Sequence, residues 1–198
     1  MSPIAGITLA GVLLLTGCTS GGSTPGRSLP PAASTTELKA RAALDPCPQV
    51  PRPPPSGRSG TGGLPDLQLA CLGDGPAVRL TGLTGPAVVN LWAAWCDPCR
   101  REAPAFQRLH AAAGDRLRVL GVLTEDTTRD ALDAAAHWGI HYPSVVDADG
   151  EMKARSGVQG LPVTYFVSAS GEADRYVGPP LSYDQLRRLV AQHLGVRV

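Results

Sequence analysis

The sequence predicts an α/β domain in which a mixed central sheet is flanked by helices. Two continuous apolar runs, residues 86–94 and 117–123, are typical of strands that are buried on both faces of a sheet. Residues 98–113 and 127–138 carry apolar or small residues at helical spacing, so helices alternate with these strands. Strands and helices that alternate in this way form a layered domain, with helices packed on both faces of one sheet.

The remaining elements make the sheet mixed. The predicted domain begins at Leu64, where residues 64–72 and the segment from Val78 to Leu80 form a hairpin around the turn Gly73-Asp74-Gly75. The later elements are, in order, helix 98–113 closed by Gly114, strand 117–123, helix 127–138 capped by Thr127 and closed by Gly139, strand 142–147, strands 163–167 and 174–177 joined by a turn, and helix 182–194 capped by Ser182. The terminal hairpin adds antiparallel pairing.

Composition and charge exclude several classes of protein. Hydrophobic residues make up 43% of the chain, which is enough for a real core and rules out full disorder. The net charge is +1 with no basic run, so nucleic acid is a poor candidate partner. His137 and His141 are four positions apart, but Gly139 breaks the helix between them. We therefore expect neither a metal site nor another cofactor.

Residues 4–15 form an apolar run that suits the hydrophobic region of a secretory signal, because spanning a bilayer takes about 20 residues. The run ends in Leu15-Thr16-Gly17-Cys18, which resembles the lipobox of bacterial lipoproteins. Residues 1–17 are thus expected to be a signal peptide and Cys18 the lipidation site. An uncleaved anchor and a buried apolar segment are the alternatives, since residues 2–8 carry no Lys or Arg.

Residues 18–63 are expected to form a lipid-anchored tether. Gly, Pro, Ser and Thr dominate this stretch, and such a composition cannot bury enough apolar surface to offset chain entropy. Within it, residues 35–44 are rich in helix formers and favour a short helix. The tether would hold the folded domain, residues 64–198, clear of the membrane.

The chemistry is concentrated in Trp95-Cys96-Asp97-Pro98-Cys99, which follows a buried strand and opens a helix. Two cysteines three positions apart in a first helical turn can form a small-ring disulfide. The unpaired N–H groups and the dipole of the helix N-terminus favour thiolate, which predicts Cys96 as the exposed nucleophile and Cys99 as the resolving thiol. Half of a zinc site and a purely structural disulfide are the alternatives.

This motif and the downstream Leu161-Pro162-Val163-Thr164 resemble the thioredoxin superfamily, and most closely its membrane-tethered TlpA- and ResA-like branch. Glu102 and Pro104 complete the pattern C-x-x-C-x-x-E-x-P of that branch, and Asn90 stands where cytosolic thioredoxins have a buried Asp. The resemblance implies a thioredoxin-like fold with an N-terminal hairpin and a central βα insertion around residues 127–138.

The resemblance also implies how a substrate binds. The proline that corresponds to Pro162 is cis in this superfamily and packs beside the cysteines, which leaves the backbone of Leu161 free to pair with an extended peptide. Trp95 is expected to shield the disulfide and to contact the substrate. An ordinary trans proline at the edge of a strand is the alternative for Pro162.

Glu102 has two interpretations. It is either a carboxylate that takes and returns the proton of Cys99, or a first-turn acid that only complements the helix dipole. Asn90 cannot accept a proton, so Glu102 is the nearest carboxylate that could do this work.

Cys47 and Cys71 form a second pair, for which we predict a structural disulfide. Such a bridge closes a loop of about 25 residues and would stabilise the fold by about 3–4 kcal/mol. A second exchange-active pair is the alternative.

The function predicted from these features is that of a thiol–disulfide oxidoreductase, lipid-anchored at the extracytoplasmic face of the bacterial cell membrane. The resemblance implies protein substrates with thiols or disulfides, such as apocytochrome c before haem attachment, and electrons from a membrane partner protein. The alternatives are oxidative folding of secreted proteins and, in another class, a non-catalytic lipoprotein that handles Cu(I). The direction of exchange depends on the stability of the disulfide between Cys96 and Cys99.

Overall fold

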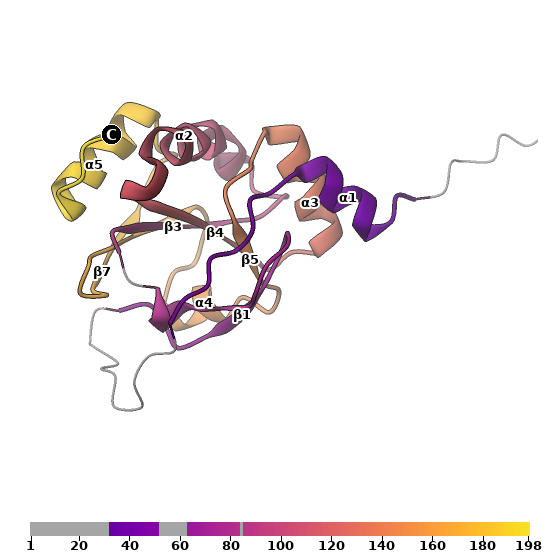
Figure 1. Ribbon diagram of the computed structural model, residues 1–198, viewed down its shortest axis with the longest axis horizontal. Helices are drawn as coiled ribbons and strands as arrows, with labels where there is room; N and C mark the ends of the chain where they lie inside the picture. Colours follow the sequence, from indigo (N-terminus) through magenta and orange to yellow (C-terminus); the bar gives the residue numbers. More distant parts are fainter. Residues whose placement is uncertain (1–31, 52–62, 84) are drawn as a thin grey trace, which may run out of the picture. The chain divides into compact units, whose positions relative to one another are not determined.

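A computed structural model describes residues 32–51, 63–83 and 85–198 of the chain. Ala33–Val198 form one compact unit built around a seven-stranded sheet of order β2-β1-β5-β4-β3-β6-β7 (Figure 1). The strands are β1 (Gln68–Cys71), β2 (Val78–Arg79), β3 (Ala87–Trp92), β4 (Arg118–Thr124), β5 (Ser144–Asp147), β6 (Val163–Val167) and β7 (Ala173–Val177). Strands β3, β4 and β5 are parallel, and the outer strands pair antiparallel, so the predicted mixed sheet is confirmed.

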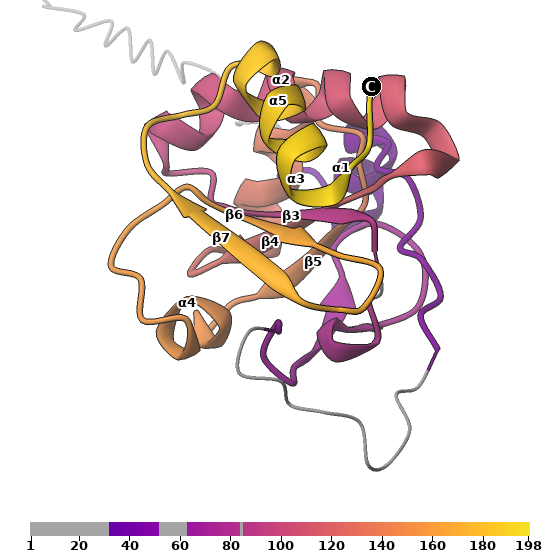
Figure 2. The same cartoon turned by 90° about the vertical axis from the view of Figure 1, so that its left-hand side faces the viewer.

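Helices cover both faces of this sheet, as predicted (Figures 1 and 2). They are α1 (Thr35–Ala42), α2 (Asp97–Ala113), α3 (Thr128–Trp138), α4 (Glu151–Arg155) and α5 (Tyr183–Leu194). Helices α1, α2, α3 and α5 contribute buried side chains to one hydrophobic cluster, which also contains both cysteines of the motif. Helix α4 and the N-terminal hairpin contribute to a second cluster on the other face of the sheet, which includes the side chains of β3 and β4 that point to that face. Side chains alternate along β3 between two cores, one on each face of the sheet, which explains why all of its residues are buried.

The folded unit begins earlier than the predicted boundary at Leu64, and the tether assignment for residues 33–51 is corrected. Helix α1 starts with a capping box between Ser34 and Glu37, and it buries Leu38 and Ala42 against the cluster that α3 also joins. Burial of these two side chains gives the segment the apolar contacts that its average composition does not suggest. Residues 52–62 lie outside the described residues.

Two further differences concern short elements. The first strand covers Gln68–Cys71 instead of residues 64–72, because Leu64 and Leu67 pack on the core before the ladder begins. Helix α4 was not predicted, and it forms because the carboxylate of Asp147 accepts hydrogen bonds from the backbone N–H groups of Glu151 and Met152, both at 3.0 Å. Because α4 has only five residues and depends on this capping contact, its sequence shows no helical periodicity that would predict it.

Within the part of the chain that the structure describes, no helix combines the length and the apolar character needed to cross a bilayer. The predicted signal peptide, residues 1–17, and the predicted lipidation site, Cys18, lie outside the described residues.

Candidate active site

The predicted redox motif lies where β3 ends and α2 begins. Cys96 is the N-cap residue of α2, and its Sγ accepts a hydrogen bond from the backbone N–H of Cys99 at 3.1 Å. The two cysteines form a disulfide. Pro98 occupies the first turn of α2. Backbone N–H groups in a first turn have no carbonyl partner within the helix, so the N–H that proline lacks costs no hydrogen bond there. A helix N-terminus that already donates to Sγ provides the same stabilisation to a Cys96 thiolate.

The prediction that Cys96 is exposed is wrong. The exposed fraction is 3% for Cys96 and 2% for Cys99, because both belong to the hydrophobic cluster beneath α2. The neighbouring Trp95 is instead 58% exposed, and its indole is held by a hydrogen bond from Nε1 to the carbonyl oxygen of Glu125 at 3.0 Å. A substrate therefore meets an apolar ring beside a largely enclosed disulfide.

Pro162 follows a cis peptide bond, as predicted. Antiparallel pairing of Val163 with Leu91 places Pro162 level with Trp92, the last residue of β3. The cis-proline segment and the cysteine motif thus begin at the same end of the sheet. Pro162 is buried and Leu161 is partly exposed. The structure therefore brings Leu161, Pro162 and Trp95 to the end of the sheet that carries the disulfide.

Glu102 lies in the second turn of α2 and not at its N-terminus, so the helix-dipole alternative is wrong. Its side chain is buried with an exposed fraction of 1%, and it is three positions from Cys99 on the same face of the helix. Its carboxylate accepts hydrogen bonds from Nδ2 of Asn90 at 2.8 Å and from the backbone N–H of Leu181 at 3.1 Å. Burial raises the pKa of Glu102 to about 7, although these two hydrogen bonds oppose the shift.

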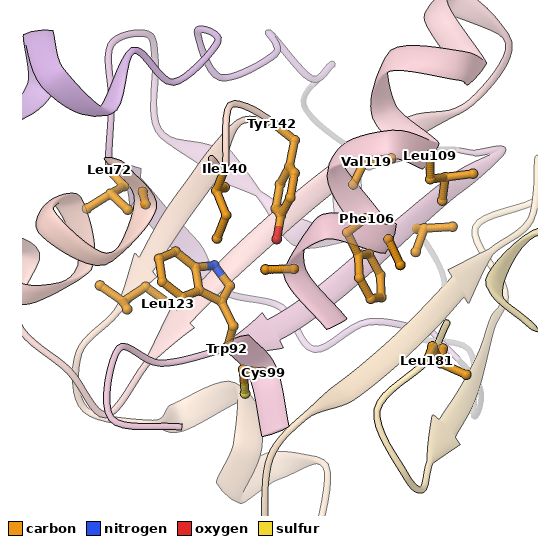
Figure 3. Close-up of a cluster of buried hydrophobic side chains, with 14 of the residues drawn as sticks. Leu72, Trp92, Cys99, Phe106, Leu109, Val119, Leu123, Ile140, Tyr142 and Leu181 are labelled. Atoms are coloured by element: carbon orange, nitrogen blue, oxygen red, sulfur yellow. The ribbon is translucent and has the colours of Figure 1, made fainter. Parts of the chain in front are cut away.

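Aromatic side chains make this region apolar. Figure 3 shows the hydroxyl group of Tyr142 directed toward the indole of Trp92, with Cys99 and Phe106 in the same cluster. Burial, followed by the nearby charge of Glu102, raises the pKa of Tyr142. A Cβ on Gly121 would come within 2.8 Å of Nε1 of Trp92, so glycine is needed where the indole crosses β4. Trp92 lies in the core, with an exposed fraction of 1%.

The second cysteine pair is also a disulfide, as predicted, with 5.9 Å between the Cα atoms of Cys47 and Cys71. Cys71 pairs with Val145 at the start of β5, whereas Cys96 follows the end of β3. The register runs from Cys71 through Val145 and Val122 to Leu91, so Cys71 lies level with the end of β3, and strands β5 and β4 stand between them. The two disulfides are therefore on strands that are not adjacent in the sheet, which favours a structural role for the second bridge.

The two histidines considered for a metal site have other partners. Nδ1 of His137 contacts the carbonyl oxygen of Asp133 at 2.8 Å, and Nδ1 of His141 contacts that of Ala43 at 3.1 Å. Among the described residues, no group of three or more His, Cys, Asp or Glu side chains could hold a metal ion.

Three functional contacts were not predicted from the sequence. Asp126 accepts a hydrogen bond from the backbone N–H of Ala94 at 2.5 Å, Glu125 holds Trp95, and Leu181 holds Glu102. The position of the first two follows from the parallel strands, because the carboxyl ends of β3 and β4 share one edge of the sheet. No sequence pattern indicates the contact of Leu181.

Substitution of Glu102 by Gln is expected to change how stability depends on pH. A carboxyl whose folded-state pKa is about 7, against an ordinary value of 4.5, destabilises the fold progressively as the pH rises from about 4.5 to 7. In Glu102→Gln, this loss, about 3 kcal/mol, is expected to disappear. The measurement is the free energy of unfolding by urea at pH 5 and pH 8.

The matched control is Glu151→Gln, the same change at an exposed position on α4. It is expected to preserve the pH dependence of the unmodified chain. Identical pH dependence in Glu102→Gln and the unmodified chain would contradict the raised pKa of Glu102.

Comparison with known proteins agrees with this geometry. Residues 63–174 match the AhpC/TSA family. The chain is 32% identical over 127 residues to the thiol-disulfide oxidoreductase ResA of Oceanobacillus iheyensis, covering 62% of this chain and 66% of that relative. It is 30% identical over 131 residues to the thiol:disulfide interchange protein HelX of Rhodobacter capsulatus, covering 59% and 73%.

A solved structure shows the same fold. A secreted disulfide oxidoreductase of Mycobacterium tuberculosis, homologous to E. coli DsbE, superposes with a TM-score of 0.58 and 26% sequence identity. The superposition covers 64% of this chain and 96% of that chain. The predicted thioredoxin-like fold is confirmed.

The family match contains the cysteine motif, Glu102 and Pro162, which are the residues that carried the resemblance to TlpA- and ResA-like proteins. ResA and HelX are thiol–disulfide oxidoreductases of that type. The chain belongs to the AhpC/TSA family of thioredoxin-like proteins, in its TlpA/ResA-type branch.

Proposed function

We propose that this protein is a thiol–disulfide oxidoreductase that reduces disulfides of specific proteins. The observation that carries the proposal is the Cys96–Cys99 disulfide at the N-terminus of α2, on the same end of the sheet as the cis peptide bond before Pro162. This arrangement provides a thiol that the helix N-terminus activates and a second thiol within reach of it.

Reduction proceeds in two exchange steps. The Cys96 thiolate attacks one sulfur of the substrate disulfide, which forms a mixed disulfide and releases the other substrate sulfur as a thiolate. The Cys99 thiolate then attacks Sγ of Cys96, which releases the second substrate thiolate and leaves the Cys96–Cys99 disulfide. Two electrons pass from the protein dithiol to the substrate, and the reverse sequence oxidises a substrate dithiol.

Glu102 would accept the proton of Cys99 before the second step and return it when the dithiol is restored. Its position three residues from Cys99 and its pKa of about 7 support this role, since a proton carrier works best when its pKa is close to the ambient pH. Trp95 and the backbone of Leu161 would bind the substrate chain beside the disulfide. The exposed indole of Trp95 supports the contact, and Leu161 is next to the cis-proline.

The proposed location is the extracytoplasmic face of the bacterial cell membrane, with Cys18 as the lipid anchor. The lipobox-like Leu15-Thr16-Gly17-Cys18, a relative described as secreted and the second disulfide support it. The proposed substrates include apocytochrome c before haem attachment, and a membrane partner protein would return electrons to the Cys96–Cys99 pair. Palmitate labelling that persists in Cys18→Ala would contradict the lipid anchor.

The direction of electron flow is tested by equilibrating the full chain with mixtures of reduced and oxidised glutathione. If the protein is a reductant, its Cys96–Cys99 pair is expected to stay oxidised at ratios of reduced to oxidised glutathione that reduce the disulfide of an oxidising relative. The reason is that a stable Cys96–Cys99 bond corresponds to a low reduction potential. The oxidised fraction is measured by mass spectrometry after alkylation of free thiols. A potential as high as that of the strong oxidant DsbA, about −120 mV, would instead assign the protein to oxidative folding.

A further inference from the structure

The turn that carries the cysteines rests on the loop that follows β4. The carboxylate of Asp126 accepts a hydrogen bond from the backbone N–H of Ala94 at 2.5 Å. The carbonyl oxygen of Glu125 accepts a hydrogen bond from Nε1 of Trp95 at 3.0 Å. Ala94 and Trp95 directly precede Cys96 in the chain. The loop therefore holds the chain on the amino side of the reactive sulfur, opposite the helix that holds it on the carboxyl side.

The backbone of this loop adopts an uncommon conformation. Glu125 has a φ of 53°, in the left-handed region that few residues other than glycine occupy. Its carboxylate pairs with Nζ of Lys153 on α4 at 2.5 Å, and a Cβ on Gly150 would come within 2.6 Å of its Cγ. A left-handed conformation persists where the surroundings determine it, and such positions concentrate at functional sites. Helix α4 thus holds the side chain of Glu125, whose carbonyl oxygen binds Trp95.

We propose that Asp126 positions the turn before Cys96 and that its carboxylate opposes the negative charge of the Cys96 thiolate. Both carboxylate oxygens are held, because the second oxygen accepts the backbone N–H of Thr127 at 2.7 Å. The charge is therefore fixed beside Ala94, two residues from Cys96. This inference deepens the proposed function, on which it rests, by naming a residue that sets the reducing strength of the pair.

The expected size of the effect follows from the distance. The carboxylate of Asp126 is 2.5 Å from the nitrogen of Ala94, and two residues of backbone and one side chain separate that nitrogen from the sulfur of Cys96, so the carboxylate lies within about 14 Å of the sulfur. Even at that largest separation and an effective dielectric constant of about 40, the repulsion changes the ratio of thiolate to thiol about threefold. Among the described residues Asp126 has no cationic partner. Of the other charged groups around the motif, Asp97 pairs with Arg100, Glu125 pairs with Lys153 and Glu102 is buried beneath α2. Arg101 on α2 and Arg129 on α3 are exposed to solvent.

Opposition to the thiolate makes the pair a better reductant. The helix N-terminus stabilises the thiolate of Cys96, and a fixed carboxylate on the other side offsets part of that stabilisation. Because the reduced form carries the thiolate, the offset favours the Cys96–Cys99 disulfide over the dithiol. Asp126 then shifts the equilibrium toward donation of electrons, which is the direction proposed for this protein.

The test compares Asp126→Asn and Asp126→Ala in the full chain. In the reduced proteins, alkylation of Cys96 by iodoacetamide at pH 5–6 is expected to be at least about threefold faster in both variants, since each removes the opposing charge. Their equilibrium with glutathione is expected to shift toward the dithiol by a similar factor. Alkylation is followed by mass spectrometry of the peptide that contains Cys96, as a function of pH.

Asp130→Asn is the matched control, because it removes an equal charge four positions away, where the carboxylate accepts the hydroxyl of Thr127. It is expected to leave the alkylation profile unchanged. The proposal is overturned if the folded Asp126 variants alkylate like the unmodified chain, or if Asp130→Asn accelerates alkylation equally. A shifted profile in a protein that reduces no disulfide would refute the proposed function and leave the role of Asp126 intact.

Discussion

Replacement of Cys96 by Ser is expected to lower the rate of insulin disulfide reduction by on the order of 100-fold or more. Serine keeps the size and the hydrogen bond from the backbone N–H of Cys99, but a hydroxyl does not form a thiolate at neutral pH. The covalent step is therefore lost while α2 remains capped. The measurement is the precipitation rate of reduced insulin with dithiothreitol as the electron source.

Replacement of Cys99 by Ser is expected to stop the reaction one step later. Cys96 can still attack, but the resolving thiol is absent, so the mixed disulfide between Cys96 and the substrate accumulates. Mass spectrometry of these adducts from the native membrane fraction identifies the substrates. Insulin reduction by both variants at the rate of the unmodified chain would exclude the proposed enzyme function.

A matched variant separates the chemistry from the fold. The variant is Asp97→Asn. Asp97 lies between the two cysteines and is exposed, and its partner Arg100 is also exposed. Because an exposed ion pair contributes little, this variant is expected to reduce insulin within about twofold of the unmodified rate. Loss of activity in Asp97→Asn as large as in Cys96→Ser would indicate that the assay reports folding of the motif.

The features that were predicted from the sequence are those that depend on neighbours along the chain. The apolar run of β3, the start of α2 at the cysteine motif, and the strand β6 after Pro162 are all local patterns. Family resemblance added the cis bond before Pro162. These patterns were sufficient to place the disulfide at the start of a helix beside the sheet.

The features that were not predicted depend on contacts between distant residues. The carboxylate of Glu102 is held by Leu181, which is 79 positions away, and Ala94 is held by Asp126, 32 positions away. Burial of Cys96 results from the packing of several helices over one face of the sheet, so a helix N-terminus alone did not indicate it. The boundary at Leu64 failed for the same reason, because the helix formers of residues 35–44 indicated a short helix but not its packing against the core.

Joint replacement of Cys47 and Cys71 by Ala is expected to lower the free energy of unfolding by about 3–4 kcal/mol. The bridge spans a sequence separation of 24, and its loss frees a loop in the unfolded chain, whose entropy then increases. The measurement is unfolding by urea, monitored by far-ultraviolet circular dichroism. The double variant Cys96→Ala/Cys99→Ala is the control, because its separation of only 3 predicts a smaller loss, about 2 kcal/mol.

The same replacement tests whether the second bridge is structural. Cys47 ties the segment after α1 to β1, which β5 and β4 separate from the strand that leads to Cys96. Its removal is therefore expected to increase amide exchange in α1 without slowing insulin reduction below about half. The backbone N–H of Cys47 also donates to Asp74 at 2.8 Å, which limits the opening to local unfolding. Unchanged stability together with lost activity would reverse the assignment and make Cys47 and Cys71 part of the exchange path. Lost stability with retained activity would establish that the two disulfides have separate functions, one holding α1 to the sheet and the other exchanging with substrate.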